Sequence, residues 1–108
     1  IAPYQRALGL AAGWKIDDAA MLATGERIWN LEKLFNVREA CRREDDNLPQ
    51  RMTSQTFTVG SKKGATFSAE KQMVLLDNYY EGRGWDKKTS LPTPEKLKAL
   101  GLDKLGSK

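Results

Sequence analysis

Apolar residues recur at helical spacing along residues 18–41, and this is the strongest pattern in the sequence. The apolar members of this stripe are Met21, Leu22, Ile28, Trp29, Leu31, Leu34 and Phe35. Spacings of three, four and seven residues place such side chains on one face of an α-helix. Asp17 comes just before the stripe and is a favourable N-cap residue. We therefore predict one long helix from Asp18 to about Cys41.

Three shorter segments also carry helix signals. The first is predicted to run from Pro3 to about Ala12, because proline suits the first turn of a helix. The second begins after Ser68, an N-cap residue, and ends near Gly82. The third begins at Thr93, which is followed by a proline and a glutamate. A mixed apolar and polar pattern supports each of the three.

Polar and turn-forming residues occupy the connections. Residues 42–52 are charged and then turn. Residues 53–66 contain two glycines, and we expect an extended surface loop there, with at most a short strand at residues 56–59. The sequence therefore predicts an all-α fold of about four helices with irregular loops, in a single segment over residues 1–108.

Charge and composition exclude several classes of protein. The net charge is +4, but the 18 basic residues are interspersed with 14 acidic ones, which indicates a mixed, solvated surface. A basic helix face with Arg38, Arg42 and Arg43 is an alternative site for nucleic acid, but no aromatic residues are interleaved with it. We expect no nucleic-acid partner. No apolar run reaches the roughly 20 residues of a membrane helix, so we expect no membrane partner either.

Residues that could carry chemistry are few. The chain has no histidine, and its single cysteine, Cys41, has no histidine to act as its base and cannot form a zinc or iron–sulfur site alone. That single thiol fits a reducing compartment, and we expect a cytoplasmic location. Asp45 and Asp46 lack the spacing of a calcium loop, and we expect a turn there. We predict no catalytic, cofactor-binding or metal residue in this chain.

Tyr79, Tyr80 and Trp85 form an aromatic group near the end of the third predicted helix. Such a group can bind a ligand, but it is more often part of a core or an interface. Arg83 lies between two glycines in the same stretch. We expect its guanidinium group to lie flat on one of those rings or to bond to a buried carbonyl.

Four segments, in the same order and at similar spacing, resemble the C-terminal end of the tungsten-containing aldehyde ferredoxin oxidoreductase family. They are TGERIWNLEKLFNVRE at residues 24–39, DDNLPQR at 45–51, YYEGRGWD at 79–86 and PTPEKLKALGL at 92–102. The resemblance extends from about Leu10 to Leu102. It implies the helical C-terminal segment of a larger multidomain enzyme.

The resemblance also implies the chemistry of the full-length enzyme. Members of the family oxidise aldehydes to carboxylates and pass the electrons to ferredoxin, using a tungsten bis-pterin and a 4Fe-4S cluster that lie on segments upstream of this one. The partners implied are those upstream domains and ferredoxin, and a homo-oligomer stays open. We expect no cofactor in this segment and no activity from it alone. The alternative is a stand-alone helical protein-interaction module without enzyme activity.

Two departures from the family pattern and a set of structural residues complete the expectations. The family usually has glycine after Glu39, where Ala40 and Cys41 stand here, so the long helix is expected to continue. It often has a turn glycine before Pro92, where Ser90 and Leu91 stand. Trp29 and Phe35 are interpreted as core, and an apolar stripe that includes them would be left exposed if this segment folded alone. We predict structural roles, as buried polar anchors and core aromatics, for Arg27, Asn36, Asp46, Arg51, Tyr80, Arg83 and Trp85.

Overall fold

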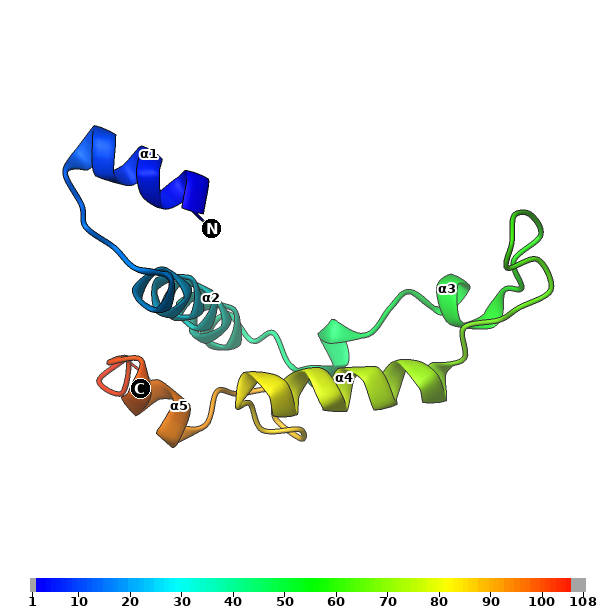
Figure 1. Ribbon diagram of the computed structural model, residues 1–108. Coiled ribbons are helices and arrows are strands. Elements are labelled where there is room, and N and C mark those ends of the chain that lie inside the picture. Colours follow the sequence, from blue (N-terminus) through cyan, green and yellow to red (C-terminus); the bar gives the residue numbers. More distant parts are fainter. Residues whose placement is uncertain (1, 106–108) are drawn as a thin grey trace.

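The computed structural model describes residues 2–105 and is helical throughout its regular structure (Figure 1). The elements in chain order are α1 (Ala2–Ala12), α2 (Asp18–Arg38), the 3-10 helix η1 (Arg43–Asp46), α3 (Gln50–Ser54), α4 (Ala69–Arg83) and α5 (Pro94–Ala99). Among the described residues there are only two isolated β-bridges, Thr56 with Thr66 and Trp85 with Pro92. The predicted all-α fold is confirmed. The prediction of a short strand at residues 56–59 is wrong, because Thr56 alone of these residues forms a β-bridge and no strand results.

Three helix starts follow from the capping residues that the sequence indicated. The Asp17 carboxylate accepts a hydrogen bond from the Ala20 backbone amide at 2.7 Å. Ser68 caps α4 and Thr93 caps α5 in the same way, each through its side-chain oxygen. These bonds satisfy backbone donors that the first turn of a helix leaves unpaired.

The end of α2 departs from the prediction that the helix continues to about Cys41. The helix ends at Arg38, and Ala40 adopts the left-handed conformation with φ of 70°. The Cys41 amide then bonds to the Asn36 carbonyl at 2.9 Å, and the Ala40 amide bonds to the Val37 carbonyl at 3.1 Å. This pair of bonds is the Schellman motif, which normally places glycine at the left-handed residue. The backbone closes the helix in this way although glycine is absent.

Ser90, in the turn before Pro92, also adopts the left-handed conformation without being a glycine. It has φ of 60° and is fully buried. Ala40 and Ser90 are the two described non-glycine residues with positive φ. Both occupy places where the family pattern suggests glycine, so the two departures substitute side chains at positions whose backbone conformation favours glycine.

The chain forms an open, elongated arrangement around a small core. Its extents are 53 × 37 × 21 Å and its radius of gyration is 18.3 Å, against about 13 Å for a compact domain of this length. The core proper is a cluster of Leu97, Leu100 and Leu102, with Leu34 of α2 packed on it. In Figure 1, α1 lies away from α4 and α5, and the loop after α3 projects beyond the start of α4.

The apolar stripe of α2 faces outward. Ile28, Leu31 and Phe35 keep 55%, 46% and 54% of their surface exposed, whereas Asn30 and Lys33 on the opposite face are buried. The interpretation of Trp29 and Phe35 as core is wrong within this segment, because Trp29 is also exposed. The expected exposed apolar stripe is confirmed.

Candidate functional site

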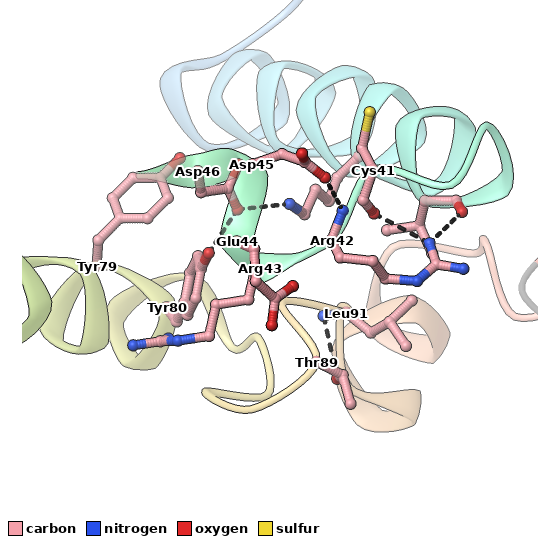
Figure 2. Close-up of polar contacts among 12 residues, drawn as sticks. Cys41, Arg42, Arg43, Glu44, Asp45, Asp46, Tyr79, Tyr80, Thr89 and Leu91 are labelled. Atoms are coloured by element: carbon pink, nitrogen blue, oxygen red, sulfur yellow. Dashed lines mark hydrogen bonds and ion pairs between the residues drawn. The ribbon is translucent and has the colours of Figure 1, made fainter. Parts of the chain in front are cut away.

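The polar centre of the molecule is the Asp46 carboxylate at the end of η1. Its Oδ2 atom accepts a hydrogen bond from the Lys33 ammonium at 2.9 Å and one from the Tyr80 hydroxyl at 2.5 Å (Figure 2). Lys33 retains only 7% of its surface in contact with solvent. A buried ammonium group is tolerated when a carboxylate neutralises it. Asp46 therefore joins α2, η1 and α4 at one point.

Trp85 and Asn30 extend this network into the interior. The Trp85 indole Nε1 donates to the Asn30 side-chain oxygen at 2.8 Å, and the Asn30 amide donates to the Glu26 carbonyl at 2.8 Å. The Lys33 ammonium also lies 5.2 Å from the Trp85 ring centroid, within the range of a cation–π interaction. Asn30 and Lys33, the two buried polar residues of α2, therefore each have polar partners.

Burial determines the chemistry open to Tyr80. Burial raises the pKa of the Tyr80 phenol, and the Asp46 carboxylate that accepts its proton raises that pKa further. Tyr80 is therefore a protonated hydrogen-bond donor at neutral pH. This arrangement favours a structural role over proton abstraction or nucleophilic attack.

A second cluster connects α2 to α4 and α5. Glu26 pairs with Arg83, and its other carboxylate oxygen lies 2.9 Å from the Lys96 ammonium. The hydrogen bond from Lys96 and the charges of Lys96 and Arg83 lower the pKa of Glu26 against the opposing effect of burial. The Arg83 guanidinium lies 5.4 Å from the centroid of the Tyr79 ring, which is one of the rings named in the sequence expectation. Arg27 donates to the Leu100 carbonyl at 3.0 Å.

Arg43 is a third connecting residue, and sequence reasoning missed it. Its guanidinium pairs with Asp77 at 2.6 Å, donates to the Lys87 carbonyl at 2.5 Å and lies 5.2 Å from the Tyr80 ring centroid. Lys33, Asn30 and Glu26 lie off the apolar stripe by which the sequence predicted this helix. No residue-level signal in the sequence distinguished them from exposed polar residues.

The predicted structural residues fall into three groups. Asp46, Tyr80 and Trp85 meet in the central network, and Arg83 and Arg27 belong to the cluster beside it. Asn36 is exposed and lines a cavity, while Arg51 is exposed on α3 and donates to Gln55 at 3.1 Å, away from the centre. The structural roles of all seven residues stay a prediction.

An open cavity of about 350 Å³ lies between α2 and α4, above the central network. Trp29, Lys33 and Asn36 of α2 and Tyr79 and Tyr80 of α4 contribute to its walls. The Trp29 indole donates to the Tyr79 hydroxyl at 2.8 Å. The cavity therefore has aromatic walls and a single buried cation.

The single cysteine of this chain cannot by itself hold an iron–sulfur cluster, which needs several cysteine ligands. The sequence has no histidine and one cysteine, and within residues 2–105 no group of three or more His, Cys, Asp or Glu side chains is placed to hold a metal ion. The Asp45 carboxylate accepts from the Arg42 amide at 2.7 Å, as a turn residue does. In the described part of the chain, no helix has the length and apolar character to cross a membrane.

Comparisons with known proteins agree with one another. The family profile described as "Aldehyde ferredoxin oxidoreductase, domains 2 & 3" matches residues 1–102. The tungsten-containing aldehyde ferredoxin oxidoreductases of Pyrococcus abyssi and Pyrococcus furiosus are each 37% identical to this chain, over 93% and 92% of its length. The matched region is only 16% of each relative, so the chain spans about a sixth of them.

A solved structure shows the same arrangement of elements. It is described as "Active site complex BamBC of Benzoyl Coenzyme A reductase in complex with 1,5 Dienoyl-CoA". The similarity has a TM-score of 0.70 with 27% sequence identity, and it covers 95% of this chain and 14% of that one. There too, the matched unit is a small part of a much longer polypeptide.

Proposed function

This chain belongs to the aldehyde ferredoxin oxidoreductase family, and from that premise we propose that it is the C-terminal structural segment of a tungstopterin, iron–sulfur aldehyde oxidoreductase. The full-length enzyme would oxidise an aldehyde to a carboxylate and pass the electrons to ferredoxin in the cytoplasm. The names of the relatives support this activity. The segment would contribute no catalytic group and would be inactive alone.

The observation that carries the proposal is the orientation of α2. This helix places Asn30 and Lys33 inward and Ile28, Leu31 and Phe35 outward. A helix at the surface of an independent protein normally has the opposite arrangement. The outward apolar face is explained if the remainder of a longer polypeptide covers it.

The exposed area supports the same conclusion. The chain has an accessible surface of 8455 Å², whereas a folded monomer of this mass is expected to have about 6,000 Å². The outer face of α2 also borders a groove lined by Leu31, Leu34, Phe35 and Leu91, with Arg38 and Arg42 at its edge. A groove lined by several apolar side chains on an exposed helix face is typical of an interaction site.

The inner network defines what the segment would contribute to the enzyme. Because Asp46, Lys33 and Tyr80 connect α2, η1 and α4 through fixed hydrogen bonds, α2 can present its outer face as a rigid surface. The tungsten pterin would supply the redox chemistry of the full-length enzyme. The residues that hold it would lie in the upstream segments of the full-length enzyme.

The test is the intact mass of the protein purified from its natural source, with metal analysis on the same sample. We expect a chain several times heavier than 12.1 kDa that contains tungsten and iron. A native chain of about this mass without tungsten would contradict the proposal. It would favour the alternative, a stand-alone helical interaction module whose α2 face binds a separate partner.

A further inference from the structure

The groove beside the outer face of α2 combines apolar walls with a basic edge. It has a volume of about 880 Å³ and is formed by α2, the turn before α5 and the residues after α5. Its apolar lining consists of Leu31, Leu34, Phe35, Val37, Leu91 and Leu105. Arg38 and Arg42 lie along its edge, and no aspartate or glutamate of the described residues lines it. The groove therefore favours an occupant that is apolar and negatively charged.

Arg42 is held in place at this edge but has no carboxylate partner. Its Nη1 atom donates to the Val37 carbonyl at 2.7 Å and to the Cys41 carbonyl at 3.0 Å (Figure 2). Val37 belongs to the last turn of α2, where a positive charge is favourable. Within residues 2–105, no carboxylate forms an ion pair with the Arg42 guanidinium. Its Nε and Nη2 hydrogens form a planar fork that matches a carboxylate.

Arg38, at the same edge, differs from Arg42 in its partners. The Arg38 Nε atom donates to the Glu39 carboxylate at 3.3 Å, and the guanidinium lies 5.1 Å from the Phe35 ring centroid. Its charge is therefore already paired within the segment, whereas the remaining donors of Arg42 face solvent. A charge that is removed from water is tolerated only with a paired charge and hydrogen bonds. A segment that covers the groove must therefore bring an acceptor to Arg42.

The extent of the apolar surface indicates a stretch of polypeptide as the occupant. Ile28 lies one helical turn before Leu31, outside the groove, and is 55% exposed. Leu31 and Phe35 also line a second depression of about 280 Å³ on the same helix. The exposed apolar face thus extends along α2 beyond the groove. Since the matched region is only 16% of each relative, a polypeptide of their length has ample chain to cover this face.

We propose that a segment from elsewhere in the same polypeptide binds in this groove and pairs an aspartate or glutamate with Arg42. This inference rests on the proposed function, because it requires the longer chain. It adds the chemistry of the covering segment, which has apolar side chains against Leu31 and Phe35 and a carboxylate at the end of α2. The ion pair with Arg42 fixes the position of that segment along the groove.

Carbodiimide coupling of the natural full-length protein tests this pairing, because the reagent joins an amine to a carboxylate only when the two are in direct contact. The variant Arg42→Lys supplies an amine at position 42 and keeps the positive charge. After proteolysis, mass spectrometry identifies the residue that is joined to this position. We expect an aspartate or glutamate from outside these 108 residues. Arg42→Gln, which has no amine there, should lose the link.

The matched control is Arg38→Lys at the same edge. Because the Arg38 guanidinium pairs with Glu39, we expect the new amine to couple to Glu39 and not to a distant segment. The links elsewhere in each variant should equal those in the unmodified protein, which shows that the variants are folded.

The absence of any link from position 42 to a carboxylate outside these 108 residues would overturn the proposal. A link to a second copy, detected in a mixture of isotope-labelled and unlabelled protein, would also overturn it. Tungsten content of the unmodified protein tests the proposed function separately. If tungsten is present and no outside carboxylate couples, the enzyme assignment stands and the groove assignment fails. If the natural chain is long and couples as expected but contains no tungsten, the groove assignment stands and the enzyme assignment fails.

Discussion

The two ends of this molecule are organised in different ways. At one end, α2, η1, α5 and the second half of α4 are connected by side chains far apart in sequence, among them Asp46, Tyr80 and Trp85. At the other end, α3 and residues 55–67 form an arm in which Phe57 and Val59 are exposed. The arm pairs internally through the Thr56–Thr66 bridge and through backbone hydrogen bonds of Phe57 with Gly64 and Ala65. One end of the segment is therefore held together by polar contacts between residues far apart in sequence. The arm, in contrast, is held by pairing within itself.

The largest effect expected is from Asp46→Ala at the connected end. This change leaves the Lys33 ammonium buried without its carboxylate and removes the acceptor of the Tyr80 hydroxyl. Breaking a fully buried pair costs about 3–5 kcal/mol, and since Asp46 is a third exposed we expect about 2–3 kcal/mol. Urea unfolding measures the loss. The double variant Lys33→Met with Asp46→Leu should recover most of it, and failure to recover would mean that the ion pair is not the cause.

Tyr80→Phe tests the same end with a smaller change. Loss of the hydroxyl that donates to Asp46 should lower the free energy of unfolding by about 1 kcal/mol. Because the folded state raises the pKa of Tyr80 above its ordinary value of 10.0, the unfolded chain loses this proton first, and stability falls as pH rises above about 10. Unfolding between pH 8 and 11 should show a shallower decline in the phenylalanine variant. An identical decline in both proteins would contradict this role of Tyr80.

Ala40→Gly should stabilise the connected end slightly. The left-handed conformation costs an alanine about 1–2 kcal/mol, and the greater freedom of glycine in the unfolded chain offsets part of the gain, so we expect about 0.5–1 kcal/mol. The matched control is Ala23→Gly inside α2, which should be destabilising by about 1 kcal/mol. A destabilising effect of Ala40→Gly, like that expected for Ala23→Gly, would show that Ala40 is not strained.

Val59→Ser in the arm should have the smallest effect. Val59 is 79% exposed, and substitutions at such positions usually change stability by less than about 0.5 kcal/mol. Chemical unfolding of the 108-residue chain provides the measurement. A loss comparable to that of Asp46→Ala would remove the distinction between the two ends.

The fold could be predicted from the sequence where the signal is local. Asp17, Ser68 and Thr93 are capping residues, and α2, α4 and α5 begin at the residues that follow them. The end of α2 was missed because its left-handed residue is Ala40, and an alanine gives no signal for a stop. Local capping chemistry is thus readable from sequence when the usual residue is present.

The candidate site could be predicted only in part. Asp46, Tyr80 and Trp85 were selected and lie together, but their partners Lys33 and Asn30 lie off the apolar stripe of α2 and were not selected. The periodicity of apolar and polar residues identifies the two faces of a helix. It does not say which of the two faces packs against the rest of the segment. That choice depends on what covers the helix, and for α2 we propose that the cover lies outside this chain.

The central claim is that the outer face of α2 is buried in the natural protein, and hydroxyl-radical footprinting tests it most directly. Oxidation of Ile28, Leu31 and Phe35 would be quantified in the native full-length protein and compared with the same residues after denaturation. Strong protection of all three is the predicted result, in contrast to their exposure in the segment alone. Oxidation in the native protein at the rate of the denatured one would contradict the account.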